Sequence, residues 1–204
     1  MRNPLRKLVY ALAALGAGAL LIWLSTSGRL GPEDSVASLG AGMGGFVLLC
    51  LGGYFVPASL RAARGRARLI AGADVVVRWP VSAADWERFR AIDLAASGVR
   101  APALDGLQFI PGSCPAADGT EIIVGPASVL VGDYFLSFTP RHGERWAESV
   151  HWLATNPRCI ALVIVSSPVG GKFGRWLLLL PVPETARDAG AEAMRHYNSV
   201  LSRP

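Results

Sequence analysis

The stretch Leu39–Arg68 reads LGAGMGGFVLLCLGGYFVPASLRAARGRAR and joins a glycine-rich apolar run to a cluster of four arginines. Residues 35–59 carry no charge, and a helix that crosses a bilayer needs about 20 predominantly apolar residues. The run is long enough to span, and Tyr54 stands near its end, where interfacial aromatic side chains are favoured. A positive cluster directly after such a run is typical of a segment retained on the cytoplasmic side.

A second apolar run lies nearer the N-terminus. Leu8–Leu24 reads LVYALAALGAGALLIWL without a charge. It exceeds the usual apolar region of a signal peptide, about 7–15 residues, and Ser25–Ser27 is a poor cleavage site, so an uncleaved span is the better interpretation. We expect spans at about 6–26 and 37–57, which makes residues 1–58 a transmembrane helical hairpin.

The basic residues beside the two spans predict their orientation. The flanks contain Arg2, Arg6 and Lys7 before the first span and Arg61, Arg64, Arg66 and Arg68 after the second. The connecting loop, 27–34, has one Arg against two acidic residues. Under the positive-inside rule both termini are cytoplasmic. The abundance of Arg, Ala and Gly is typical of a bacterial source with a GC-rich genome. Together with the two spans, it leads us to expect a multi-pass protein of a bacterial cytoplasmic (inner) membrane.

The basic segment 59–72 has two interpretations. Its four arginines set topology, and they can also bind anionic headgroups, because each Lys or Arg near an anionic leaflet gains about 1 kcal/mol. Topology is favoured, since four is the minimum of the usual cluster of about 4–8. Lipid recognition by Arg61, Arg64, Arg66 and Arg68 is the alternative.

The distribution of charge argues against two classes of function. The net charge of +5 arises in the membrane flanks, because residues 69–204 hold twelve basic and thirteen acidic side chains. Nucleic-acid binding needs a basic face on the folded domain, so we expect no nucleic-acid partner. The spans lack Asp, Glu, Lys, Arg and His, which disfavours an ion or proton path.

Small residues in the spans predict close helix packing. In the second span Gly40, Gly44 and Gly52 recur at multiples of four, with Gly45 on the adjacent stripe, and Gly18 lies in the first span. Such faces let helix backbones approach closely. The partner is either the other span of the hairpin, a second copy of the chain, or another membrane protein.

The pattern of apolar and turn residues in 73–204 predicts one cytoplasmic domain. A strand at 75–79 stops at Pro80, and a helix begins at Ser82-Ala-Ala-Asp85, with Trp86, Phe89, Ile92 and Ala96 at helical spacing. Strands are then expected at 120–124, 128–131, 134–138, 145–153, 159–165 and 174–180, separated by turn residues, with Leu177–Leu180 buried on both faces. A final helix opens at Pro183-Glu184 and ends near Leu201. This order predicts an α+β domain, an antiparallel curled sheet with a C-terminal helix.

The chain resembles small bacterial inner-membrane proteins that carry two N-terminal transmembrane helices and a cytoplasmic domain of the pleckstrin-homology type. The resemblance rests on four stretches: 76–86 (VVRWPVSAADW), 123–132 (IVGPASVLVG), 156–160 (NPRCI) and 180–184 (LPVPE). It covers about two-thirds of the chain and implies a fold and a location. The early helix after the first strand departs from the ordinary pleckstrin-homology order.

Motifs of enzymatic chemistry are incomplete. Gly170-Gly-Lys-Phe173 fails the phosphate-loop pattern, because Ser166 replaces its first Gly and Phe173 its Ser or Thr, so a hairpin turn is preferred. The three histidines are too scattered for a metal pair, and no Ser lies in GxSxG. Cys50, Cys114 and Cys159 lack CxxC spacing. We expect no cofactor, no metal and no catalytic residue.

One polar and aromatic cluster could bind a partner: Arg141, His142, Arg145 and Trp146. Solvated turn residues beside a strand Trp are the preferred interpretation. The leading hypothesis is therefore a non-enzymatic, membrane-tethered interaction or scaffold module that docks a protein through its cytoplasmic domain. The alternatives are an anionic-lipid sensor that uses the juxtamembrane arginines and an unrecognised enzyme.

Overall fold

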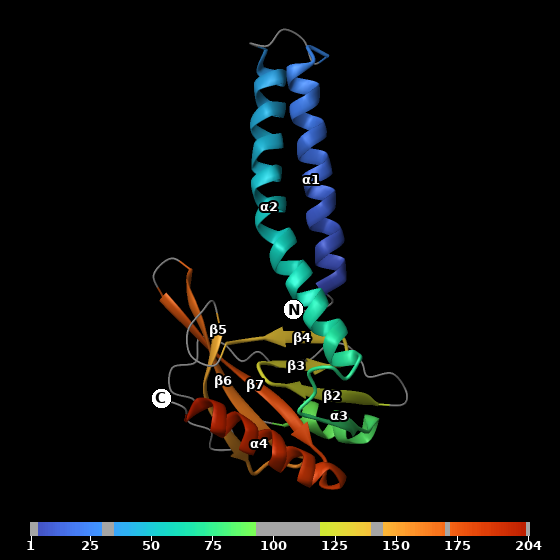
Figure 1. Ribbon diagram of the computed structural model, residues 1–204, viewed down its shortest axis with the longest axis vertical. Helices are drawn as coiled ribbons and strands as arrows, with labels where there is room; N and C mark the ends of the chain where they lie inside the picture. The colour runs from blue at the N-terminus through green and yellow to red at the C-terminus, as the bar shows by residue number, and fades with distance from the viewer. Residues whose placement is uncertain (1–3, 30–34, 93–118, 140–144, 170–171, 203–204) are drawn as a thin grey trace. The chain divides into compact units, whose positions relative to one another are not determined.

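A computed structural model describes residues 4–29, 35–92, 119–139, 145–169 and 172–202. The chain divides into two compact units between Arg64 and Gly65, inside the segment expected to link the spans to the domain. The first unit is helical, and the second contains antiparallel sheets and shorter helices (Figure 1).

The first unit is a helical hairpin of α1 (Pro4–Thr26) and the first part of α2 (Val36–Ile70). Both helices are long and apolar enough to cross a membrane, as expected from the sequence. Pro57 neither ends nor interrupts α2. A proline removes one backbone hydrogen bond, but the Ala, Leu and Arg residues that follow it are strong helix formers, so the helix continues.

Three glycines bring the two helices into backbone contact. A Cβ added to Gly18 would lie 2.7 Å from the carbonyl oxygen of Gly45, and one added to Gly45 would lie 2.8 Å from that of Gly18. A Cβ added to Gly52 would lie 2.6 Å from the Leu15 side chain and 3.0 Å from the carbonyl oxygen of Ala11. Only glycine permits this approach, because any larger residue would place side-chain atoms inside the opposite helix.

Two serines join the helices at the other end of the contact. The Ser25 hydroxyl donates to the Ser38 carbonyl over 2.8 Å, and the Ser38 hydroxyl donates to the Ser25 carbonyl over 3.1 Å. Each hydroxyl therefore has a partner, which satisfies polar groups that would be costly to leave unpaired in an apolar setting.

The strands of the second unit form two antiparallel sheets. The first has the order β1-β2-β3-β4 and contains β1 (Val77–Val81), β2 (Thr120–Gly125), β3 (Ser128–Val131) and β4 (Tyr134–Ser137). The second has the order β5-β6-β7 and contains β5 (Arg145–Leu153), β6 (Arg158–Val169) and β7 (Lys172–Val182). The prediction of one curled sheet is wrong. Among the described residues, one isolated bridge, between Thr139 after β4 and Trp146 of β5, connects the two sheets. The hydrogen-bond ladder of the first sheet therefore does not continue into the second.

Pro80 lies within β1, where the sequence predicted the strand to stop. β1 is an edge strand whose only neighbour in the described sheet is β2. A proline is tolerated there because its missing N–H can face away from the ladder. β6 pairs with β7 out to Val169 and Lys172, as expected of two strands joined by a hairpin, and the predicted turn residues Gly170 and Gly171 lie outside the described residues.

The domain has three helical elements besides the end of α2: α3 (Ala83–Arg90), the short 3-10 helix η1 (Glu184–Ala186) and α4 (Arg187–Leu201). Ser82 caps α3 by accepting a hydrogen bond from the N–H of Asp85, as its spacing predicted. The helix ends earlier than predicted, at Arg90; Ile92 is partly buried, and Ala96 lies outside the described residues. α4 packs against β5 and β1, one strand from each sheet, and closes the core between them.

The core lies between the two sheets and under α4. Leu177–Leu180 is buried throughout, which confirms the expectation of a strand covered on both faces. The indole Nε1 of Trp79 on β1 donates to the carbonyl of Pro181 on β7 over 2.9 Å, so a buried hydrogen bond connects the sheets. Tyr197 of α4 donates to the turn between β2 and β3, which fixes the helix over this core.

Candidate functional site

The four arginines of the basic cluster lie on the end of α2 and have two different environments. Arg66 forms an ion pair with Asp133 at 3.1 Å and is half-buried, and Arg68 pairs with Asp74 at 2.7 Å. Both partners belong to the domain, and the next residue of the helix, Leu69, is 1% exposed in its core. These two arginines attach the last turns of α2 to the domain.

Arg61 and Arg64 belong to the first unit and are exposed. Neither forms an ion pair with any residue that the structure describes. Arg61 donates from Nε to the Pro57 carbonyl one turn earlier, over 3.3 Å. Residues three apart share a helix face, so Arg61 and Arg64 lie on the same face of α2, just beyond its apolar part.

The predicted packing glycines also separate into two groups. Gly18, Gly45 and Gly52 lie at the contact between α1 and α2, whereas a Cβ at Gly40 or Gly44 would meet nothing within 4 Å. The hairpin therefore uses part of the predicted glycine set. Gly40 and Gly44 lie on the outer side of α2, and their role in contacts beyond the hairpin stays a prediction.

The predicted partner-binding cluster is only partly within the described chain. Arg141 and His142 lie outside it. Arg145 and Trp146 begin β5 and are half-buried, and the Thr139 backbone bonds to Arg145 and bridges to Trp146. These two residues therefore take part in joining β4 to β5.

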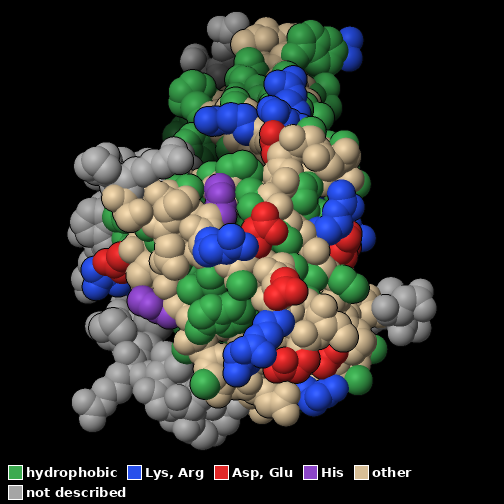
Figure 2. Space-filling view, turned by 60° about the horizontal axis from the view of Figure 1, so that its bottom comes forward, with side chains coloured by type: hydrophobic (Ala, Val, Ile, Leu, Met, Phe, Trp, Pro, Cys, Tyr) green, Lys and Arg blue, Asp and Glu red, His purple; other side chains and the backbone are tan. Residues whose placement is uncertain are grey.

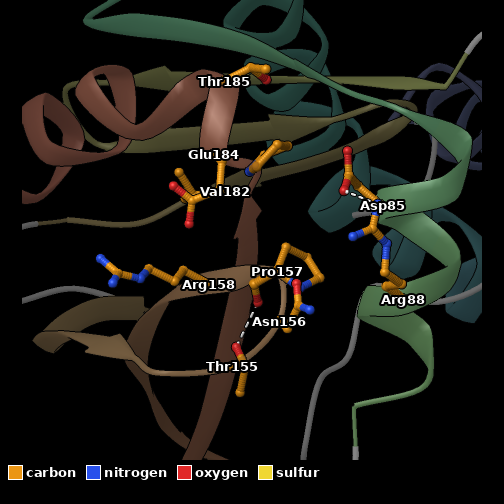
Figure 3. Close-up of a pocket in the computed structure, with 10 residues that line it drawn as sticks. Asp85, Arg88, Thr155, Asn156, Pro157, Arg158, Val182, Glu184 and Thr185 are labelled. Atoms are coloured by element: carbon orange, nitrogen blue, oxygen red, sulfur yellow. Dashed lines mark hydrogen bonds and ion pairs between the residues drawn. The ribbon is translucent and has the colours of Figure 1, made fainter.

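A cleft of about 550 Å³ lies on the domain where three segments meet, and we call it the domain cleft. The segments are the first turns of α3, the turn between β5 and β6, and the junction of β7 with η1 (Figure 3). Its lining residues are Asp85, Arg88, Thr155, Asn156, Pro157, Arg158, Val182, Pro183, Glu184 and Thr185. All of them belong to the second unit.

The floor and rim of the domain cleft differ in chemistry. Pro157, Val182 and Pro183 are buried and apolar, and they come from two of the three segments. The rim carries two carboxylates and two guanidinium groups, so its formal charge is balanced. Figure 3 shows Asp85 and Arg88 on one side and Glu184 on the other, with Asn156 and Pro157 between them.

The rim charges are not equivalent. Asp85 pairs with Arg88 at 3.1 Å and also accepts a hydrogen bond from the Ser82 hydroxyl. Arg158 and Glu184 are exposed and form no ion pair, with each other or with another described residue. Figure 3 shows both of them on the side of the cleft opposite Asp85 and Arg88, with the Arg158 side chain extending away from the turn.

Local hydrogen bonds hold the turn of the domain cleft in place. The Thr155 hydroxyl donates to the Pro157 carbonyl over 2.8 Å, and the Cys159 thiol donates to the same carbonyl over 3.4 Å. The thiol is buried, and burial raises its pKa to about 11. A thiolate is the reactive form of cysteine, so Cys159 is a structural donor and not a nucleophile.

Sequence reasoning identified the parts of the domain cleft only as local features. Asp85 belongs to the helix cap, Arg158 follows the Asn156-Pro157 turn, and Glu184 follows the proline that opens η1. Their chain separation is about 70 residues between the first and second, and folding alone brings them together. No spacing in the sequence signals that arrangement.

The wider surface of the domain mixes charges of both signs. Figure 2 shows a group of adjacent Lys and Arg side chains toward its top and, below that group, basic side chains beside acidic ones. Among the residues that the structure describes, no group of three or more His, Cys, Asp or Glu could hold a metal ion. Binding through mixed charges is the chemistry that this surface supports.

Comparison with protein-family models, with curated proteins and with solved structures finds no match for this chain.

Proposed function

We propose that the protein is a membrane-tethered, non-enzymatic interaction module. In this proposal the helical hairpin crosses the bacterial cytoplasmic membrane with both termini inside, and the domain docks a protein partner in the cytoplasm. The pleckstrin-homology-like character inferred from sequence belongs to the same proposal.

One observation supports the proposal most strongly. The last turns of α2 are built into the domain by Arg66, Arg68 and Leu69, while the same helix begins as an uncharged run long enough to span. A folded domain that contains the end of a span is suited to holding a binding surface at a membrane.

The lining of the domain cleft favours binding over catalysis. Its ten residues include no His, Cys, Ser or Lys, and the Thr155 hydroxyl already donates to a backbone carbonyl. Of its two carboxylates, Asp85 is bound by Arg88 and by the Ser82 hydroxyl, and Glu184 lies on the other side of the cleft (Figure 3), so neither is a nucleophile with a base beside it.

Purification of the full chain in a mild detergent tests the proposal. We expect a particle larger than one chain with its detergent, containing a second protein in a fixed ratio. Chemical cross-linking in cells before lysis should increase its recovery. Recovery of the chain alone and monomeric, from several growth conditions and after cross-linking, would contradict the proposal.

A second function, recognition of anionic lipid, is favoured by the two exposed arginines. Arg61 and Arg64 have no carboxylate partner within the described residues, so their charges can bind headgroup phosphates. Arg66 and Arg68 contribute less, because Asp133 and Asp74 already neutralise them.

Native mass spectrometry of the full chain in bilayer discs of mixed anionic and neutral lipid tests this second function. We expect retained anionic lipid to fall severalfold in the double variant Arg61→Ala/Arg64→Ala. The matched control Arg187→Ala/Arg195→Ala removes the same charge from exposed positions on α4 and should retain lipid normally. Equal retention in both double variants would remove this function.

A further inference from the structure

We propose that Trp23 and Arg29, where α1 ends and the chain turns toward α2, form a site for the phosphate of a lipid headgroup. The inference goes beyond the proposed function and rests on it in one respect, that the two helices cross a membrane. In the proposed orientation this end of the hairpin lies in the outer leaflet. The site is therefore separate from Arg61 and Arg64, which follow the second span.

The two side chains of the site are stacked. The guanidinium carbon of Arg29 lies 4.7 Å from the centroid of the Trp23 ring, and a cation is attracted to an aromatic face within about 6 Å of the centroid. Of the aromatic side chains, Trp gives the strongest attraction of this kind. The ring therefore holds the guanidinium group over its face.

The way in which α1 ends explains why Arg29 lies over Trp23. Gly28 has a φ of 69°, the left-handed conformation that ends many helices and that residues with a Cβ rarely adopt. The N–H of Ser27 still donates to the Trp23 carbonyl over 2.9 Å, so the chain reverses directly after the last turn. The reversal brings the next residue, Arg29, back toward the turn that carries the ring.

The charge of Arg29 is available to a ligand. Its side chain is exposed and forms no ion pair with a residue in the described part of the chain. Neighbouring hydroxyls bond within α1: Thr26 donates to the Ile22 carbonyl over 3.1 Å. Likewise, Ser27 donates to the Leu24 carbonyl over 3.2 Å. The guanidinium group keeps N–H donors that are not used in this way.

The place of the pair along the chain indicates a lipid phosphate as the acceptor. Trp23 is 49% exposed and stands near the end of the uncharged apolar run that begins at Leu8, at the level where a span leaves the hydrocarbon. Headgroup phosphates lie at that level, and a guanidinium group binds phosphate through two parallel hydrogen bonds. The apolar stem of an arginine lets its charge reach the headgroups while the stem stays beside apolar surface.

Native mass spectrometry of the full chain in bilayer discs tests the site. The discs contain equal amounts of phosphatidylcholine and of a galactolipid without phosphate, and the parent chain carries Arg61→Ala/Arg64→Ala so that those two arginines do not contribute. We expect the parent chain to retain phosphatidylcholine over galactolipid, and Arg29→Ala to lower that preference severalfold. Arg29→Lys should lower it in part, because an ammonium group has no planar fork. The control Arg195→Ala removes the same charge from an exposed part of α4 and should keep the preference.

Fluorine NMR of the full chain labelled with fluorotryptophan measures the stacking itself. The chain has six tryptophans, and the signal of Trp23 is the one that Trp23→Phe removes. Arg29→Ala should move this signal and leave the others in place. Gly28→Ala should also move it, and should lower the lipid preference, because alanine disfavours the left-handed conformation that returns Arg29 to the ring.

The inference is overturned if the parent chain retains both lipids equally or if Arg29→Ala leaves the preference unchanged. Loss of the preference in millimolar inorganic phosphate would indicate a site for free phosphate and would also overturn it, and an unmoved Trp23 signal in Arg29→Ala would contradict the stacking. Failure of the proposed function is a different result. A chain purified without a second protein, whose lipid preference still depends on Arg29, would overturn the interaction module and leave this site in place.

Discussion

At the scale of single residues, burial controls the ionisation of the Cys159 thiol. Cys159 lies in the core beside the turn at Pro157, and desolvation raises its pKa from an ordinary 9.0 to about 11, with a smaller opposing effect from a hydrogen bond with Thr155. Between these two values the unfolded chain releases the thiol proton while the folded domain keeps it. The unfolded state then binds fewer protons, so the free energy of unfolding falls as pH rises through this window.

We therefore expect the domain to lose stability between pH 9 and about 11 through Cys159. One pKa unit corresponds to about 1.4 kcal/mol, so the loss from this residue is up to about 2–3 kcal/mol. Unfolding of the full chain, followed by tryptophan fluorescence at pH 7, 9 and 11, measures it. Cys159→Ala should lose less stability than the wild type over this range, and an equal loss in both proteins would show that the thiol does not contribute.

Residue identity also explains why the domain cleft could not be predicted. Asp85 was expected to cap a helix, and it does, through Ser82. Its further role on the rim depends on Arg158 and Glu184 arriving from other segments, and their positions are set by the packing of β6 and β7. Local patterns describe a residue's own element, whereas a cleft is a property of how elements meet.

At the scale of elements, the periodicity of apolar and turn residues was sufficient to predict both long helices, the seven strands and the final helix. The failures have local causes. β1 extends through Pro80, where the strand was expected to stop, because it is an edge strand. α2 runs past residue 57, where the expected span ends, because strong helix formers follow Pro57. The prediction of a single sheet failed for a different reason: β4 and β5 belong to separate sheets, and in the described residues only an isolated bridge with a few hydrogen bonds, around Thr139, connects them.

The hairpin contact predicts a contrast between two neighbouring glycines. Gly45→Ile would drive side-chain atoms into Ile22 and the Gly18 backbone, whereas Gly44 faces open space. Overpacking of this kind costs about 1–3 kcal/mol or more where backbone cannot move. We expect Gly45→Ile to separate the helices and Gly44→Ile to leave them in place.

A disulfide reports on that separation. The hydroxyl oxygens of Ser25 and Ser38 are 3.1 Å apart, so Ser25→Cys/Ser38→Cys, in a chain whose native cysteines are replaced by alanine, should cross-link under mild oxidation. Addition of Gly45→Ile should reduce the cross-linked fraction severalfold, and addition of Gly44→Ile should not. The reverse order of effects would contradict the contact between α1 and α2.

At the scale of the whole molecule, the distribution of basic residues predicts how the chain is inserted. A fluorescent protein fused after Pro204 should fluoresce in the cytoplasm, and alkaline phosphatase inserted within residues 30–34 should be active outside it. Replacing Arg61, Arg64, Arg66 and Arg68 by alanine should lower both signals, because it removes the positive flank of α2. Phosphatase activity from the Pro204 fusion, with none from the loop insertion, would reverse the assigned orientation.

The glycine contact of the hairpin has a consequence for how the chain must be handled from its synthesis onward. Because the helices meet through Gly18 and Gly45, their large side chains, such as Met43, Phe46 and Tyr54, remain exposed. Packing of α1 against α2 does not bury this apolar surface. Without lipid or detergent around these side chains, we expect the full chain to aggregate. Its synthesis should therefore require a factor that shields the nascent chain from water until it is inserted.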